Sequence, residues 1–200
     1  MIRPARTKDA KEIASLVLVV LKEMELPFVK EVGEEKTIEI LTRAVEYPTY
    51  RYGYLRGIVK EIDGEVAGVA FGYKDSEEPL IDQPLEEVLA SFGLPNQSLF
   101  LELETYPDEW YLDTIVVKET FRGRGVGAEL IEAASQRAQA EGAPAMGLMG
   151  AMAVLRLKVP GLPTCSPITS TSVPPVSTRR AKRSVIAPAL VTTMGNAPSL

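Results

Sequence analysis

The sequence contains no histidine and only one cysteine, Cys165. Histidine is the usual general base near neutral pH and a frequent metal ligand, so other residues would have to fill both roles. A single cysteine excludes a disulfide framework and any cysteine cluster for a metal ion. We therefore expect no metal site in this protein.

Long apolar runs are also lacking. The apolar run at residues 13–21 is too short to cross a bilayer. Acidic as well as basic residues precede it, and no small-residue cleavage site follows it, which argues against a secretory signal. We predict a cytoplasmic protein with no membrane partner.

Acidic residues stop abruptly along the chain, because all 27 Asp and Glu lie at or before Glu141. The first 141 residues carry 16 basic side chains and a net charge of −11, whereas the remainder carries six basic side chains, no acid and no aromatic. Seven of the 15 prolines follow Pro144. We therefore predict a folded domain at residues 1–148, then a basic tail rich in Pro, Ser and Thr at residues 149–200, with no nucleic-acid partner.

The periodicity of the first part predicts an α/β domain with a mixed sheet. An Asp63-Gly64 pair between two β-rich runs is a strong hairpin signal. Apolar residues recur at helical spacing in two earlier segments, and Thr7 is the expected N-cap of the first. The expected elements are a strand at 2–6, helices at 8–25 and 34–45, a hairpin of strands 57–62 and 65–73, a helix at 84–92 and a strand at 98–103.

Two segments invite a functional interpretation beside a structural one. The connection at residues 74–109 is unusually long and holds ten acids against one lysine. Near an active site it would favour a cationic acceptor such as an amine, and otherwise it is a solvated acidic surface. The tyrosine-dense loop at residues 47–54 either packs at the edge of the core or contacts a ligand.

The most informative stretch is residues 110–142. A β-branched run at residues 114–117 predicts a buried strand, and a glycine-rich turn and an amphipathic helix follow. The first N–H groups of a helix lack partners and carry partial positive charge, and glycines at 123, 125 and 127 allow close backbone approach. We predict a phosphate-binding cradle here, to which Arg122 and Arg124 add charge. A further strand from residue 145 completes a parallel βαβ unit.

Other interpretations of the glycine loop fit less well. A dinucleotide-binding fold requires G-x-G-x-x-G in an early βαβ unit, and the spacing here is G-x-G-x-G, far along the chain. A P-loop requires Gly-x-x-x-x-Gly-Lys-Ser/Thr, which is absent. A purely structural tight turn remains as the alternative.

In residues 1–148 a hairpin is followed by a strand, a glycine loop and a helix. In this order of elements the segment resembles the GNAT superfamily of N-acetyltransferases. The family motif Arg/Gln-x-x-Gly-x-Gly/Ala reads here Arg122-Gly123-Arg124-Gly125-Val126-Gly127. The resemblance implies acetyl-coenzyme A as the cosubstrate and direct attack by an amine of a small molecule or peptide; it leaves a homodimer open. The implied binding residues are Ile115, Val116 and Val117 for pantetheine, and Arg122, Gly123, Arg124, Gly125, Val126, Gly127 and Ala128 for the diphosphate.

The resemblance also implies that a backbone N–H near Val116 or Val117 polarises the acetyl carbonyl. Without histidine, a carboxylate or a water chain must take the proton from the amine. Asp113 and Glu109 are the candidate bases, and period-two spacing places both on the strand face that Tyr111 shares. A structural role for each carboxylate, bonded to neighbouring backbone, is the alternative.

After Gly147 and Leu148 the sequence departs from the family pattern. No tyrosine follows Tyr111, so the family's tyrosine that protonates the departing thiolate has no counterpart. We hypothesise that residues from about 149 arise from a frameshift, which translation of the other two reading frames would test; the alternative is a genuine disordered tail. We then expect the strand at 145–148 to have an unpaired edge and the chain to have reduced stability and weak activity. It could also be an inactive coenzyme A-binding remnant or a basic-tailed interaction protein.

Overall fold

The computed structural model describes residues 1–95, 99–100, 103–150 and 153–158. Its strands form one mixed sheet in the order β1-β2-β3-β4-β5-β6, in which only the β4–β5 pair is parallel. The strands are β1 (Ile2–Pro4), β2 (Gly57–Ile62), β3 (Glu65–Lys74), β4 (Glu109–Val117), β5 (Ala145–Gly150) and β6 (Ala153–Lys158). The predicted α/β class, the parallel βαβ unit and the mixed sheet are confirmed.

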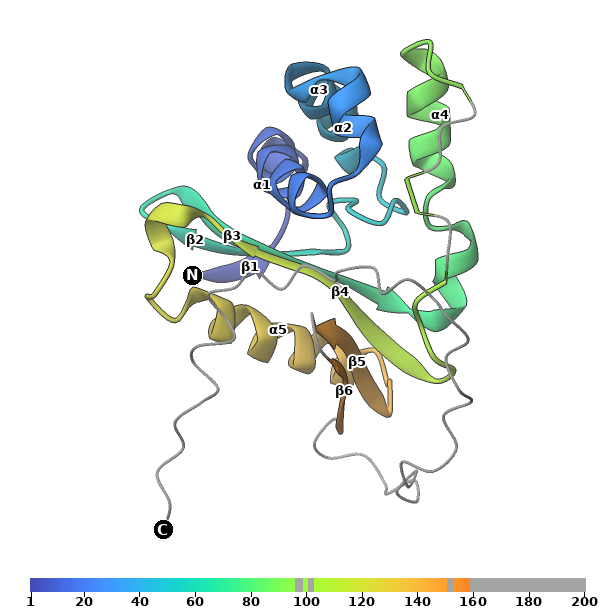
Figure 1. Cartoon of the computed structure of the whole chain (residues 1–200). Coiled ribbons are helices and arrows are strands. Elements are labelled where there is room, and N and C mark those ends of the chain that lie inside the picture. The colour runs from blue at the N-terminus through green and yellow to red at the C-terminus, as the bar shows by residue number, and fades with distance from the viewer. Residues whose placement is uncertain (96–98, 101–102, 151–152, 159–200) are drawn as a thin grey trace.

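Helices cover both faces of this sheet (Figure 1). The helices are α1 (Ala10–Glu23), α2 (Pro27–Val32), α3 (Glu34–Val45), α4 (Gln83–Ser91) and α5 (Val126–Ala140). The first four lie on one face and α5 on the other, so that β4 is buried between two apolar clusters. Within the described residues, no helix has the length and apolarity needed to cross a membrane.

The β2–β3 hairpin forms where the Asp63-Gly64 pair predicted it. Asp63 has φ 51° and Gly64 has φ 81°, the left-handed conformations that a two-residue turn of this kind requires. The predicted helix at 34–45 matches α3 at both ends, and the one at 84–92 matches α4 within one residue. These elements are encoded by local patterns, which explains the agreement.

The β3–β4 ladder contains a bulge at the centre of the sheet. Phe71 pairs with Thr114 and Gly72 pairs with Leu112, so Asp113 is the extra residue of β4. Trp110, Leu112 and Ile115 therefore point to the α5 face, where α5 packs its apolar side. The bulge changes the alternation at one point and places Asp113 and Thr114 on the same face of the sheet.

Three local predictions differ from the structure. Thr7 begins a short 3-10 turn (Thr7–Asp9) instead of capping the helix, because the Asp9 carboxylate accepts the Arg6 N–H at 2.8 Å and fixes the entry to α1. Pro27, expected to mark the end of a helix, is the first residue of α2, a position that proline favours. The strand expected at 98–103 includes residues outside the described ones (98 and 101–102), and residues 99, 100 and 103 are not in a strand.

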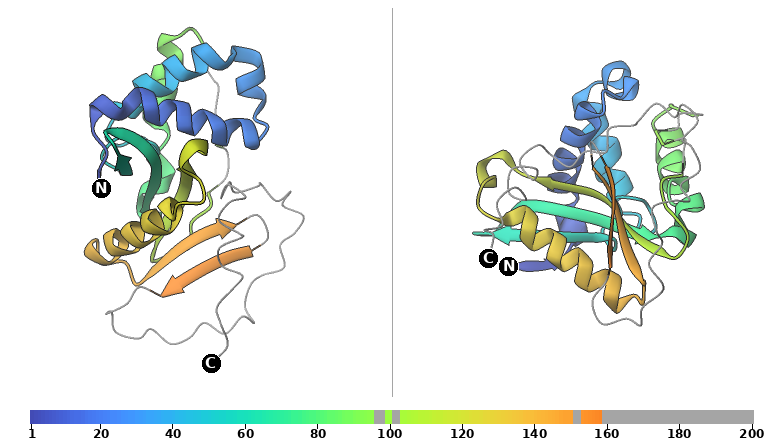
Figure 2. Two further views of the ribbon diagram at one scale, coloured as in Figure 1. Left: turned by 90° about the vertical axis from the view of Figure 1, so that its left-hand side faces the viewer. Right: turned by 60° about the horizontal axis from the view of Figure 1, so that its bottom comes forward.

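The prediction that the strand at 145–148 has an unpaired edge is wrong. β5 pairs along its length with β6, antiparallel, with Ala145 opposite Lys158 and Gly150 opposite Ala153. The two strands cross the far end of β4 at a steep angle (Figure 2). The sheet therefore continues past residue 148, where the sequence prediction ended the fold, while residues 159–200 of the predicted tail lie outside the described residues.

Candidate active site

The parallel strands β4 and β5 pair over only part of their length. The register runs from Glu109 opposite Ala145 to Leu112 opposite Leu148. Beyond Leu112, β4 continues to Val117 and turns toward the glycine loop, whereas β5 leaves it (Figure 2). The β5-facing edge of β4 from Asp113 to Val117 is therefore not covered by β5.

The N–H groups of successive residues in β4 point alternately to its two edges, and this alternation identifies the amides that face the edge not covered by β5. The Lys118 N–H donates to Ala67 O at 2.9 Å on the β3 side. Alternate residues of an antiparallel ladder bond the same neighbour, so Val116 also points its N–H to β3, and Ile115 and Val117 point theirs the other way. The carbonyl of Val117 confirms this direction, because it accepts the Arg122 Nε–H at 3.3 Å outside the ladder.

The predicted glycine cradle lies at the end of the same edge. Gly123 and Gly125 have φ of 75° and 77°, and Gly125 is the N-cap of α5. The helical hydrogen bond to the cap of α5 runs from the Glu129 N–H to Gly125 O, so the N–H groups of Val126, Gly127 and Ala128 precede it. Among the residues that the structure describes, no side chain caps this end of α5.

The space beside the glycines is open to a ligand. A Cβ built on Gly123 or Gly125 would meet no atom within 4 Å, and both residues are exposed. Arg122 is held to the end of β4 by its bond to Val117 O, and the exposed Arg124 stacks its guanidinium 5.4 Å from the centre of the Phe121 ring. Amides, helix terminus and two guanidinium groups thus converge on one accessible surface.

The opposite face of the sheet carries the two predicted bases. Glu109, Tyr111 and Asp113 share the face that α1 to α4 cover, as their spacing predicted. Asp113 lies where β5 diverges: its Oδ1 accepts Arg51 Nη1 at 2.5 Å and Tyr73 OH at 3.2 Å, and its Oδ2 accepts Thr114 Oγ1 at 2.9 Å. The carboxylate of Asp113 is therefore the partner of a buried cation.

Glu109 lies deeper, between β4 and β5. Its Oε1 accepts the Tyr106 N–H at 2.8 Å, and its carboxylate fills the place where a side chain of Gly147 would stand, 2.5 Å from an added Cβ. Glu109 is 2% exposed and lies within the paired part of β4 and β5. The structure thus separates the two candidates: Asp113 is at the divergence and Glu109 is four residues before it.

Arg51, which the sequence analysis did not single out, organises this face. It is 3% exposed and forms ion pairs with Asp82 at 2.9 Å and with Asp113 at 2.5 Å. Its Nη1 also donates to Tyr73 OH at 2.7 Å, and its guanidinium lies 4.4 Å from the centre of the Phe100 ring. Burial acts to lower the pKa of Arg51, but the charge of Asp113 and its other partners hold that pKa well above the ordinary value.

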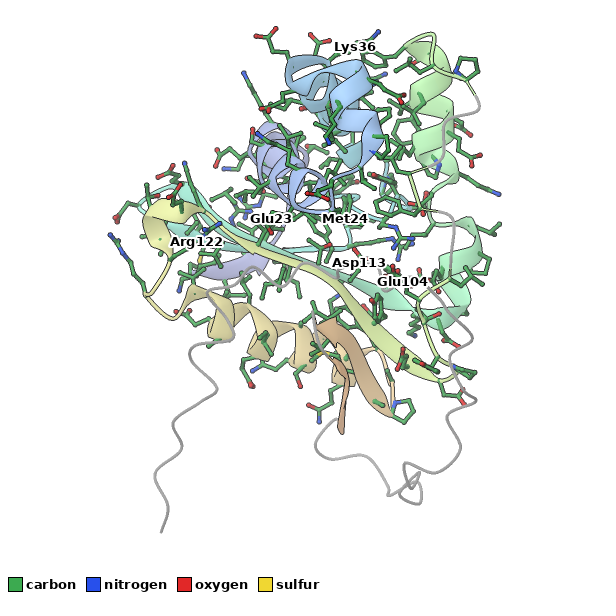
Figure 3. All side chains as sticks on the ribbon, in the orientation of Figure 1. Glu23, Met24, Lys36, Glu104, Asp113 and Arg122 are labelled. Atoms are coloured by element: carbon green, nitrogen blue, oxygen red, sulfur yellow. The ribbon has the colours of Figure 1, made fainter. Side chains whose placement is uncertain are left out.

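The acidic connection before β4 supplies carboxylates to the same region. Glu78, which is 4% exposed, accepts the Glu104 N–H at 2.7 Å, the Thr105 N–H at 3.0 Å and the Tyr73 OH at 3.3 Å. Burial raises the pKa of Asp82 despite its bond to Arg51, and burial also raises the pKa of Glu104. The prediction of a solvated surface is therefore wrong for these three acids. Of the three, Glu104 is labelled in Figure 3, near the same part of β4 as Asp113.

The tyrosine-rich loop packs mainly into the core. Tyr50 and Tyr52 are 0% and 2% exposed, and their rings meet edge to face at 5.6 Å. Tyr52 also packs on Phe71, with ring centres 5.2 Å apart, and its hydroxyl lies 3.4 Å from Thr114 Oγ1. Packing is thus what the structure shows for these two tyrosines. The loop positions Arg51 between them.

Comparison with known proteins identifies the family. The model of the acetyltransferase (GNAT) family matches residues 21–156, which is more than half of the chain. The chain belongs to the GNAT acetyltransferase family. The match includes the first residues of β6 and so extends beyond the resemblance found in the sequence, which ended at residue 148. GNAT membership makes the protein an acyl-transferring enzyme by class.

Solved structures agree with the GNAT assignment. One crystal structure of an acetyltransferase is 53% identical, with a TM-score of 0.71, and the alignment covers 74% of this chain and 79% of that one. An N-acetyltransferase from Staphylococcus aureus Mu50 is 27% identical, with a TM-score of 0.65 and coverage of 76% and 82%. A search among curated proteins found no match. Among the described residues of this GNAT chain, no group of three or more Cys, Asp or Glu side chains could hold a metal ion.

Proposed function

We propose that the protein transfers the acetyl group of acetyl-coenzyme A to a primary amine by direct attack. The observation that carries this proposal is the edge of β4 that β5 does not cover, which runs from the divergence at Asp113 to the glycine cradle at the start of α5. A cosubstrate whose pantetheine arm joins a diphosphate to a thioester matches an edge with these two ends.

In this proposal each part of the cosubstrate has a place on the chain. The diphosphate binds the amides of residues 122–128 and the guanidinium groups of Arg122 and Arg124. The pantetheine arm pairs with the backbone of residues 115–117 like an added strand. The sequence left Val116 or Val117 as the N–H that polarises the acetyl carbonyl. The alternating directions of the N–H groups in β4 favour Val117, together with Ile115, for this role, because the Val116 N–H points to β3.

The acceptor amine approaches from the face of β4 that carries Asp113 and Glu109. Both remain candidates to receive its proton or to orient it, and Asp113 is the nearer to the divergence. Arg51 pairs with the carboxylates of Asp82 and Asp113, and the negative charges of Asp113 and Glu78 both act on Glu104. This concentration of acids supports a cationic amine as the acceptor.

The C-terminal part supports a second candidate, an inactive coenzyme A-binding remnant. All seven tyrosines lie at or before Tyr111, so none from β5 onward can protonate the departing thiolate. The boundary at residue 148 and the frameshift remain hypotheses. If this candidate holds, the chain binds acetyl-coenzyme A and transfers its acetyl group slowly or not at all.

Two measurements separate these functions. Calorimetric titration with acetyl-coenzyme A is expected to show binding by an enzyme or a remnant, and no binding by a basic-tailed interaction protein. Release of the coenzyme A thiol is then measured with a panel of amines that differ in charge and length. Thiol release above the rate of hydrolysis supports the transferase, and binding without it supports the remnant.

Gly125→Ala is expected to weaken acetyl-coenzyme A binding roughly tenfold or more, equivalent to about 1.4 kcal/mol. The new Cβ would occupy the open space of the cradle, and the left-handed φ of 77° would be strained. Calorimetry measures the change. Gly93→Ala is the matched control, because Gly93 has φ 74° and open space but lies after α4; equal loss of binding in both variants would contradict the site.

A further inference from the structure

Glu104 differs from Asp82 and Asp113 in its partners. Its Oε2 accepts the Tyr111 OH at 2.9 Å, and within the described residues the structure shows no ion pair for it. Asp82 and Asp113 are both paired with Arg51. A carboxylate held by one neutral hydroxyl keeps lone pairs available to a new donor.

The position of Glu104 is fixed through its backbone. Its N–H donates to Glu78 Oε1 at 2.7 Å, and the next residue, Thr105, donates both its N–H and its hydroxyl to Glu78 Oε2. Glu78 is in turn buried under the end of β3, where it accepts the Tyr73 OH. The side chain of Glu104 is therefore presented from an anchored segment while remaining partly exposed.

Tyr111 places this carboxylate beside the divergence of the strands. Tyr111 lies opposite Gly147, one residue before the last β4–β5 pair, and its ring centre is 5.8 Å from that of Tyr73. Tyr73 bonds Asp113 directly. Figure 3 shows Glu104 and Asp113 on the same side of β4, with Arg122 toward its other end.

The charges that face Glu104 come from three surrounding segments. Burial is the largest influence and raises its pKa; the negative charge of Asp113 raises it further, and that of Glu78 adds to it. The hydrogen bond from Tyr111 and the positive charge of Arg51 act in the lowering direction. The net pKa of Glu104 is raised, which moves a carboxylate toward the range in which it can act as a base at neutral pH.

We propose that Glu104 is the general base that deprotonates the acceptor amine. This proposal rests on the acetyl transfer proposed above. A proton passes from the acceptor ammonium to a carboxylate oxygen of Glu104, and the freed lone pair attacks the thioester carbonyl carbon. The C–S bond then breaks, its electron pair leaves with the thiolate, and the second amine proton passes to this thiolate as the amide forms. In this scheme the ion-paired Asp113 positions Tyr73 and Arg51.

The test is the pH dependence of kcat/KM for Glu104→Gln, measured by thiol release with the best amine of the panel. The amide still accepts the Tyr111 hydrogen bond but cannot take a proton. We expect kcat/KM at neutral pH to fall roughly 10²-fold or more, the usual contribution of a general base, and the acidic limb of the profile to lose its dependence on this group. An amine that is already neutral at the assay pH should lose much less.

Two further variants make the result specific. Tyr111→Phe removes a hydrogen bond that lowers the pKa of Glu104, so the acidic limb should move to higher pH. Glu86→Gln changes an exposed acid of the same connection, on α4, and should leave kcat/KM unchanged. Acetyl-coenzyme A binding by calorimetry should be the same in all of them.

The outcomes distinguish this proposal from the function on which it rests. If the wild-type chain transfers acetyl groups and Glu104→Gln keeps its rate or its acidic limb, the role of Glu104 is overturned and the acetyl transfer stands. If the wild-type chain transfers to no amine, the acetyl transfer is overturned, and the base with it. An equal loss with ionised and neutral amines would assign Glu104 a structural role.

Discussion

Arg51→Met is expected to lower the free energy of unfolding by about 3–5 kcal/mol at neutral pH, because removing one partner of a buried ion pair leaves the other charge buried without compensation. Two carboxylates, Asp82 and Asp113, would lose their cation at once. The hydrogen bond to Tyr73 and the stacking on Phe100 would also be lost.

The destabilisation by Arg51→Met should decrease as the pH falls. Burial already raises the pKa of Asp82 in the folded protein, and loss of Arg51 would raise it further. A carboxyl group with a raised folded-state pKa binds its proton more readily when folded, so stability is recovered as the pH falls through that pKa toward the unfolded value. Urea unfolding at neutral and mildly acidic pH measures this effect.

A surface pair provides the control for Arg51. Arg43 pairs with Glu46 at 3.0 Å, but the side chains are 63% and 43% exposed. Arg43→Met should cost less than about 1 kcal/mol, as exposed pairs usually do. Adding Asp82→Asn and Asp113→Asn to Arg51→Met should restore part of the loss. Equal, small effects at Arg51 and Arg43 would show that the buried pairs do not hold this face together.

Gly72→Ala is expected to destabilise the protein by about 3 kcal/mol or more, at the upper end for overpacking of a core. A Cβ at Gly72 would lie 2.1 Å and 2.4 Å from two ring carbons of Trp110, and 2.6 Å from the carbonyl oxygen of Tyr111. Trp110 is fully buried and cannot move aside, and the carbonyl belongs to the backbone. The clash falls at the bulge beside Asp113, so acetyl transfer should also decrease.

Thermal or urea unfolding checks this prediction, with Gly142→Ala as the control. Gly142, just after α5, has φ 78° but open space around it, so that substitution should cost only the backbone strain of about 1–2 kcal/mol. Trp110→Leu combined with Gly72→Ala should cost less than the sum of the two single changes, since they share one contact. If the two changes were additive, the destabilisation by Gly72→Ala would not arise from its contact with Trp110.

Local signals in the sequence identified much of the fold and one end of the candidate site. The Asp63-Gly64 turn, the period of α3 and the glycine loop before α5 each depend on residues close together in the chain. The face shared by Glu109, Tyr111 and Asp113 also followed from strand alternation. These features need no knowledge of the rest of the molecule.

The features that the sequence did not indicate depend on distant contacts or on competing local signals. Arg51 lies 31 residues from Asp82 and 62 from Asp113, so no spacing rule connects them. The bulge at Asp113 depends on how β3 and β4 meet. The sequence did not indicate β6 because residues 149–200 as a whole are rich in Pro, Ser and Thr, and the β-prone stretch at 153–158 is short. The frameshift from about residue 149 stays a prediction.

Trp110 gives this protein an intrinsic optical reporter. It is the only tryptophan in the chain, it is completely buried, and its indole N–H donates to the Glu141 carboxylate at 3.1 Å. Its neighbours are Gly72 at the bulge and the β4–β5 pairs just before the strands separate. Its fluorescence therefore arises beside the point where β4 and β5 diverge, and ligand binding at the proposed site can be followed by emission without a label.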